Sequence, residues 1–124
     1  MNSDYPSPDG AYMLTLGCYE IRMSHWIEYP TLLVSATKEV LFDAPALWSA
    51  DSVEWSPDSA FVRMNLRVYP GSKPTLDVWL YPGTRRSKVL TKAVHEATET
   101  SPLLEGSLAD LLLFLKDYDK KTAR

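Results

Sequence analysis

The sequence is poor in cysteine and has no long apolar run. Its 124 residues include one cysteine, Cys18, so no intrachain disulfide can form, which favours a reducing compartment. The longest apolar run, 111–115, is far shorter than the roughly 20 residues that a membrane span requires. Residues 1–6 lack the basic and apolar regions of a signal peptide. We therefore expect a cytoplasmic protein with no membrane partner.

The motifs that hold metals and phosphates are also absent. There is no Cys-x-x-Cys, no His-x-x-x-His, no aspartate-rich loop and no glycine-rich phosphate loop. The net charge is −3 and no basic stripe runs along the chain, which argues against a nucleic-acid partner. The sequence therefore predicts neither a cofactor nor a metal site.

Proline is abundant, with nine residues that divide the chain into short segments. Because proline is excluded from central strands and helix interiors, this spacing is typical of a sheet protein. In residues 11–23 the apolar alternation changes phase after Gly17, which indicates a bulge or a bend. Residues 43–52 and 95–106 read as loops. The expected strands lie at 11–23, 31–36, 40–42, 53–55, 60–69, 75–81 and 87–94.

The C-terminal segment has the pattern of an amphipathic helix. Leucines recur at helical spacing, beginning at Leu108 and ending at Leu115, and Ser107 with Asp110 forms a variant of the capping box. We expect one domain over residues 1–124, with a flexible N-terminus at 1–6 and a helix at 107–121. The predicted fold class is α+β, a curved antiparallel sheet of five to seven strands with one C-terminal amphipathic helix. An all-β sandwich with the helix as an appendage is the alternative.

Two turns repeat at an offset of 49 residues. Ser7-Pro8-Asp9-Gly10-Ala11-Tyr12 matches Ser56-Pro57-Asp58-Ser59-Ala60-Phe61, and Trp55 precedes the second copy. In these stretches the chain resembles blade units of TolB-like and tryptophan–aspartate β-propellers. A full propeller needs four or more blades of roughly 40–45 residues, which exceeds this chain. The resemblance therefore implies a pair of blade-like meanders folded into one sheet or half-barrel.

Candidate catalytic residues are few. His25 and His95 are the two histidines, and nothing in their spacing places them together. Cys18 lies in an apolar strand, where a buried and inert thiol is the usual state. We predict no catalytic residues. A small hydrolase or nuclease that uses His25 or His95 remains an alternative function, as does a housekeeping domain that binds a small ligand.

The most informative pattern is a surface composition. One face of the two clearest strands, 60–69 and 75–81, carries one acid and otherwise aromatic residues and arginines, which are the residue types of interface hot spots. The alternative is that the helix or a second sheet layer covers this face. We predict a non-catalytic protein-binding module, specifically a small bacterial immunity protein that neutralises a toxin, with a basic toxin domain as its partner. That face carries Phe61, Arg63, Arg67, Tyr69, Asp77, Trp79 and Tyr81. The predicted partner-binding residues are the acids Glu20, Glu28, Asp51, Glu54 and Asp77, for steering, and the exposed tryptophans Trp26, Trp48 and Trp79, as anchors.

Overall fold

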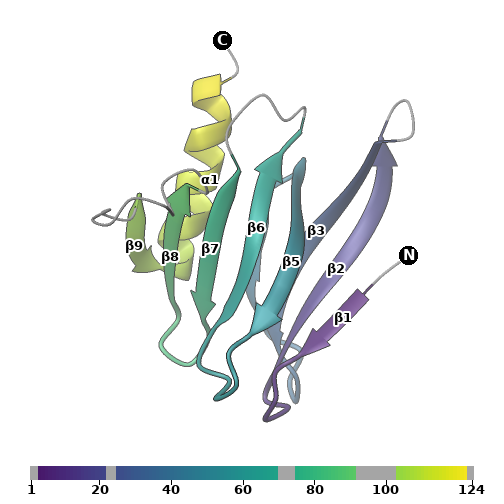
Figure 1. Ribbon diagram of the computed structural model, residues 1–124, viewed down its shortest axis with the longest axis vertical. Coiled ribbons are helices and arrows are strands. Elements are labelled where there is room, and N and C mark those ends of the chain that lie inside the picture. Colours follow the sequence, from purple (N-terminus) through teal and green to yellow (C-terminus); the bar gives the residue numbers. More distant parts are fainter. Residues whose placement is uncertain (1–2, 22–24, 70–74, 92–102, 123–124) are drawn as a thin grey trace.

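The computed structural model describes residues 3–21, 25–69, 75–91 and 103–122, which form two antiparallel sheets and one helix (Figure 1). In each sheet, neighbouring strands are consecutive in the chain, so both sheets are meanders. The first sheet contains β1 (Ser3–Pro6), β2 (Tyr12–Ile21), β3 (His25–Val34) and β4 (Val40–Asp43). The second contains β5 (Trp48–Trp55), β6 (Val62–Val68), β7 (Leu76–Tyr81), β8 (Arg86–Thr91) and β9 (Leu104–Ser107), and α1 (Leu108–Thr122) follows.

The mostly antiparallel architecture with a C-terminal helix is confirmed, but the single sheet is wrong. The chain divides after β4, because β5 forms its ladder with β6 and packs against β3. One link between the sheets is a hydrogen bond from the Glu28 backbone N–H to the Ser49 hydroxyl, at 2.9 Å. In the connection before β5, Leu47 adopts a φ of 73°, which redirects the backbone. Side-chain packing therefore joins the two ladders where the sequence predicted one continuous sheet.

Several expected boundaries also change. Residues 3–6 form β1, because they pair with residues 13–16 along the edge of β2 that β3 leaves free. This part of the N-terminus is therefore not the expected flexible segment. No register shift occurs at Gly17, so the predicted bulge is absent. The side chain of Tyr29 lies directly opposite Gly17, where a Cβ would come within 2.4 Å of its ring. The predicted loops at 43–52 and 95–106 contain the first part of β5 and most of β9.

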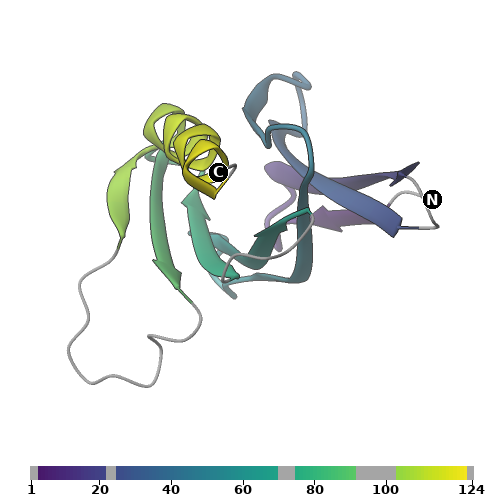
Figure 2. The ribbon, with the colours of Figure 1, turned by 90° about the horizontal axis from the view of Figure 1, so that it is seen from above.

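One buried cluster draws from both sheets and the helix. Leu14, Leu32, Met64 and Val78 are fully buried together with Leu115 of α1. Seen from above, α1 lies against the concave side of the second sheet (Figure 2). The prediction that the leucine stripe packs on a sheet is therefore confirmed.

The predicted capping box at the start of α1 is confirmed. The Asp110 N–H donates to the Ser107 hydroxyl, and the Ser107 N–H donates to the Asp110 carboxylate, each at 3.0 Å. These bonds satisfy backbone donors that the first turn of a helix leaves unpaired. Within the described ranges, no helix is both long and apolar enough to span a membrane.

The two Ser-Pro-Asp turns have the same internal hydrogen bonds. Ser7 donates its hydroxyl to Asp9 at 2.7 Å, and Ser56 donates to Asp58 at 2.8 Å. Each serine hydroxyl also accepts the N–H of the residue five positions on, which begins the outgoing segment. The Asp9 N–H donates to the Ser59 hydroxyl at 3.0 Å. The two turns therefore lie side by side and tie the sheets together at one end.

Candidate functional site

Three predicted partner-binding residues meet near one end of the β2–β3 hairpin. Glu20 lies directly opposite Trp26, and Glu28 lies on the same face of β3 as Trp26, because side chains two positions apart share a face. Glu20 and Glu28 are exposed, and the Trp26 side chain is 54% exposed. We call these three residues the acidic tryptophan patch.

The patch has the chemistry of a site for cations. Among the residues that the structure describes, neither Glu20 nor Glu28 forms an ion pair. The exposed face of an indole attracts Lys and Arg side chains through its quadrupole. Two carboxylates beside an exposed Trp26 therefore favour a partner surface that carries lysine or arginine.

Two of the predicted partner-binding residues are fully buried, and a third, Trp79, is half-buried. Trp48 is fully buried, and its ring lies 5.8 Å from that of Tyr118 on α1. It is the first residue of β5 and belongs to the core that both sheets share with the helix. Asp77 is also fully buried, because neighbouring polar side chains enclose it on the surface of the second sheet. The expectation that these two side chains are exposed is wrong.

The aromatic face predicted from the two clearest strands is not covered by the helix. Val62 and Met64 of β6 belong to the buried cluster that also contains leucines of α1. The alternate residues of the strand point to the other side, away from the concave face against which α1 lies (Figure 2). We call this other side the outer face of the second sheet. The alternative in which the helix covers it is wrong.

A row of side chains crosses the outer face from β5 to β9. In the pairing register, Trp79 of β7 lies between Arg63 of β6 and Lys88 of β8, with an acidic residue beyond each cation. The Arg63 guanidinium carbon is 5.3 Å from the centroid of the Trp79 ring, and Lys88 Nζ is 4.7 Å from it. Both distances are within cation–π range. The complete row is Glu54, Arg63, Trp79, Lys88 and Glu105.

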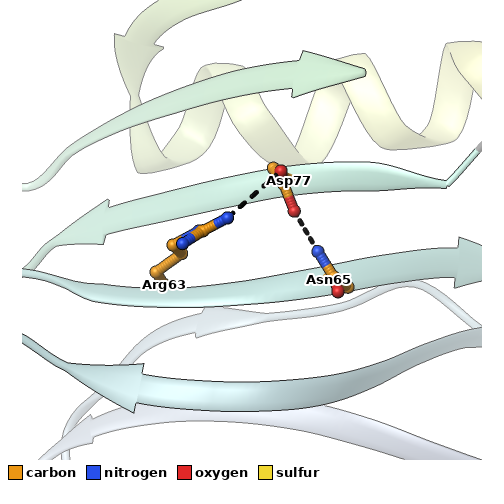
Figure 3. A network of polar contacts seen from close by, with 3 residues as sticks. All are labelled: Arg63, Asn65 and Asp77. Atoms are coloured by element: carbon orange, nitrogen blue, oxygen red, sulfur yellow. Dashed lines mark hydrogen bonds and ion pairs between the residues drawn. The ribbon is translucent and has the colours of Figure 1, made fainter. Parts of the chain in front are cut away.

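A buried carboxylate holds one of these cations in place. Asp77 lies on β7 beside the row, and its carboxylate is 3.4 Å from the Arg63 guanidinium (Figure 3). The Asn65 side-chain amide donates to the other oxygen of Asp77. Because a buried charge needs a partner, this network fixes the Arg63 side chain next to Trp79.

Two hollows lie on the outer face, one lined in part by Trp79 and the other by its cross-strand neighbour Lys88. The first, which we call the aromatic hollow, has a volume of about 230 Å³; the second, the cationic hollow, has a volume of about 360 Å³. Burial, and secondarily the charge of Glu105, raises the pKa of the Tyr81 phenol above its ordinary 10.0, so it is a neutral hydrogen-bond donor at pH 7. The aromatic hollow is lined by Trp55, Pro57, Phe61 and Trp79 with Glu54 and Arg63. The cationic hollow is lined by Tyr81, Thr84, Arg86, Ser87, Lys88 and Glu105.

The β8 and β9 side of this site was not predicted from the sequence. The partner-binding residues predicted on this face are Glu54, Asp77 and Trp79, which lie on β5 and β7. The missing information was the register: Tyr81 pairs with Arg86, which places Lys88 opposite Trp79. The short turn between β7 and β8 is the sequence signal that could have predicted this pairing.

The structure describes little of the candidate catalytic chemistry. His95 and the side chain of His25 lie outside the described residues, and Cys18 is half-buried in β2. Among the residues described, no group of three or more His, Cys, Asp or Glu side chains could hold a metal ion. Asp51, the remaining predicted acid, is exposed on β5 opposite Asn65.

Comparison with known proteins yields no relative: no family model matches the chain, and neither a curated protein nor a solved structure is significantly similar to it.

Proposed function

We propose that this protein is a non-catalytic binding module that recognises a basic protein partner through the acidic tryptophan patch. The observation that carries the proposal is the position of Trp26, which is 54% exposed and lies on one face with Glu20 and Glu28. An exposed tryptophan is uncommon and can bury a large area on contact, and tryptophan is enriched among measured hot spots.

The two carboxylates determine the charge of the partner. Exposed acids steer a basic protein toward the surface before contact and increase the association rate. After contact, the Trp26 ring provides a face for a lysine or arginine of the partner, and Glu20 and Glu28 are within reach of the same cation. Steering and anchoring are therefore assigned to different residues, which makes them separable by kinetics.

The specific form of the proposal is an immunity protein that neutralises a basic toxin domain in the bacterial cytoplasm. A net charge of −3 suits an inhibitor of a basic protein, and a chain with one cysteine suits a reducing compartment. An inhibitor of this kind neutralises the toxin by binding to it and needs no catalytic activity of its own.

The test begins with capture of a partner from the native host, followed by kinetics with the purified partner. We expect a basic protein. Trp26→Ala should increase the dissociation rate about thirtyfold, since a hot spot contributes about 2 kcal/mol and each 1.4 kcal/mol is tenfold. Glu28→Gln should mainly slow association and reduce its dependence on salt.

Glu39→Gln is the matched control, because Glu39 is exposed but lies beyond the opposite end of β3 from Trp26. This variant should leave both rates within about twofold, as expected for a charge outside the interface. The proposal is wrong if Trp26→Ala changes dissociation by less than about threefold, or if the captured partner is acidic and its association does not weaken with salt.

A further inference from the structure

The outer face of the second sheet has the features of a second binding surface, independent of the acidic tryptophan patch. Trp79 lies between two cations from its own sheet, so its ring faces are less available to a partner's lysine or arginine than the ring of Trp26 is. What this face offers instead is a pair of hollows side by side, both between the row and the neighbouring residues Phe61, Tyr81 and Arg86. Any ligand of this surface must therefore fill those hollows.

The aromatic hollow is suited to one apolar side chain. Its volume of about 230 Å³ is below the roughly 300–1,000 Å³ of pockets that hold drug-sized molecules, and aromatic residues and Pro57 form most of its lining. Phe61 is fixed against Tyr81, with ring centroids 5.5 Å apart, and Arg63 is fixed by Asp77. The hollow is thus bounded by side chains that other contacts hold in place.

The cationic hollow is suited to a carboxylate. Arg86 and Lys88 point to the same face of β8, and within the described ranges neither forms an ion pair. Thr84 and the neutral Tyr81 phenol add hydroxyl groups to the lining. Glu105 lines the same hollow opposite Lys88, so the two cations leave a net positive charge there. With the neighbouring donors, this forms a site for one anionic group of a ligand.

The acids at the ends of the row distinguish a peptide from a nucleic acid. Glu54 lies opposite Arg63 and Glu105 lies opposite Lys88, so an acid stands beside each cation of the row. The face therefore presents no continuous basic track for a phosphate backbone. A single carboxylate fits the local positive charge, and a polyanion does not. Aromatic residues with arginine are also the composition of protein interfaces.

The spacing of the strands sets the spacing of the ligand's side chains. The aromatic hollow is centred near β6 and the cationic hollow near β8, and strands about 4.8 Å apart place these about 10 Å from each other. A peptide in the polyproline II conformation advances about 3.1 Å per residue with three residues per turn, so side chains three positions apart point the same way and cover this distance.

We infer that the outer face of the second sheet binds a segment of a partner protein in the polyproline II conformation, with an aromatic side chain in the aromatic hollow and an acidic side chain three residues away in the cationic hollow. This site takes a partner segment of the opposite charge to the one that the acidic tryptophan patch takes. Binding at either surface can therefore be abolished without affecting binding at the other.

The experiment is selection of a phage-displayed random dodecapeptide library on the wild-type protein, with counter-selection on Trp79→Ala. We expect enrichment of sequences with an aromatic residue three positions from Asp or Glu. The best synthetic peptide should bind Trp79→Ala and Arg86→Glu at least about tenfold more weakly than wild type by isothermal titration calorimetry. Arg86 is exposed, so its reversal tests the site without altering the core.

Trp26→Ala is the matched control, because it removes an exposed tryptophan from the other sheet and should leave the affinity of the peptide unchanged. The inference is overturned if no sequence is enriched, if the selected peptides lack an acidic residue, or if they bind Arg86→Glu as tightly as wild type. It is also overturned if a dodecathymidylate oligonucleotide binds in a manner that Trp79→Ala and Arg86→Glu abolish. Failure of the patch at Trp26 would leave each of these outcomes unaffected.

Discussion

The two meanders begin alike and differ on their surfaces. Each has a first strand that ends in a Ser-Pro-Asp turn with the same hydrogen bonds, and each continues as consecutive antiparallel strands. On the first sheet, Trp26 is exposed between acidic residues; on the second, Trp79 is half-buried between Arg63 and Lys88. A shared turn therefore specifies how the chain reverses and leaves the chemistry of the surface to the cross-strand neighbours.

The turns themselves differ at one position. Gly10 has a φ of 76°, and Ser59 occupies the corresponding place with a φ of 64°. Serine is strained there, since left-handed backbone favours glycine, but its hydroxyl accepts the Asp9 N–H of the first turn. The second turn thus has a contact that a glycine could not make, and this contact connects the two meanders.

The largest expected effect tests whether the meanders share one core. Leu115→Ala should destabilise the protein by about 2–5 kcal/mol, because Leu115 is fully buried in the cluster that both sheets contribute to. Leu113→Ala, at a side chain 65% exposed, should cost less than about 0.5 kcal/mol. Urea denaturation followed by circular dichroism and tryptophan fluorescence should give one coincident transition. Two separate transitions would show that the meanders unfold independently and are two domains.

An intermediate effect tests the equivalence of the turns. Ser7→Ala and Ser56→Ala should each cost about 1–3 kcal/mol, because each removes the acceptor for a backbone N–H of a half-buried residue, Tyr12 or Phe61. Chemical denaturation measures both. Ser35→Ala is the control: its hydroxyl makes no hydrogen bond to the described residues, and we expect a change within about 0.5 kcal/mol. If the losses of stability for Ser7→Ala and Ser56→Ala differ by more than about 1 kcal/mol, the two turns are not equivalent.

The smallest effect is the dependence of the turns on pH. Hydrogen bonds from the Ala11 N–H and the Ser7 hydroxyl lower the pKa of Asp9 below its ordinary 3.8, and bonds from Ser56 and Ala60 do the same for Asp58. A carboxylate with a lowered folded-state pKa contributes stability that is present above about pH 3.8 and is lost as the pH falls through the folded value.

Asp9→Asn and Asp58→Asn should therefore be less stable than wild type near neutral pH, with a difference that shrinks in acid. Thermal unfolding between about pH 6 and pH 2.5 measures this, a range that brackets the ordinary carboxyl pKa. A difference that stays constant over the range would mean that the carboxylate charge has no part in either turn. A shrinking difference for one turn alone would sharpen the distinction between them.

Local sequence signals were accurate where the interaction was local. Ser107 and Asp110 cap the helix as expected, and the leucines at helical spacing are buried or half-buried against the core. A cap and a stripe depend only on residues a few positions apart. The strands expected at 60–69 and 75–81 are likewise present as β6 and β7, which pair with each other. The likeness of the Ser-Pro-Asp turns to propeller blades stays a prediction.

Errors arose where a residue's position depended on distant segments. Trp48 was read as an exposed loop residue, because nothing next to it in the chain shows that Tyr118 and both sheets enclose it. Gly17 was read as a bulge, although its role is to leave room for the ring of Tyr29 across the ladder.

The sequence by itself determined the turns, the helix and the alternation of its clearest strands, because these follow from proline, capping and periodicity over a few residues. The tertiary structure alone decided that the ladder divides into two sheets, and that Trp26 meets Glu20 while Trp79 meets Arg63 and Lys88. Those outcomes depend on register and on packing between segments far apart in the chain. A shift of one residue in register turns each side chain to the opposite face, so the surface chemistry of this protein is a property of its pairing.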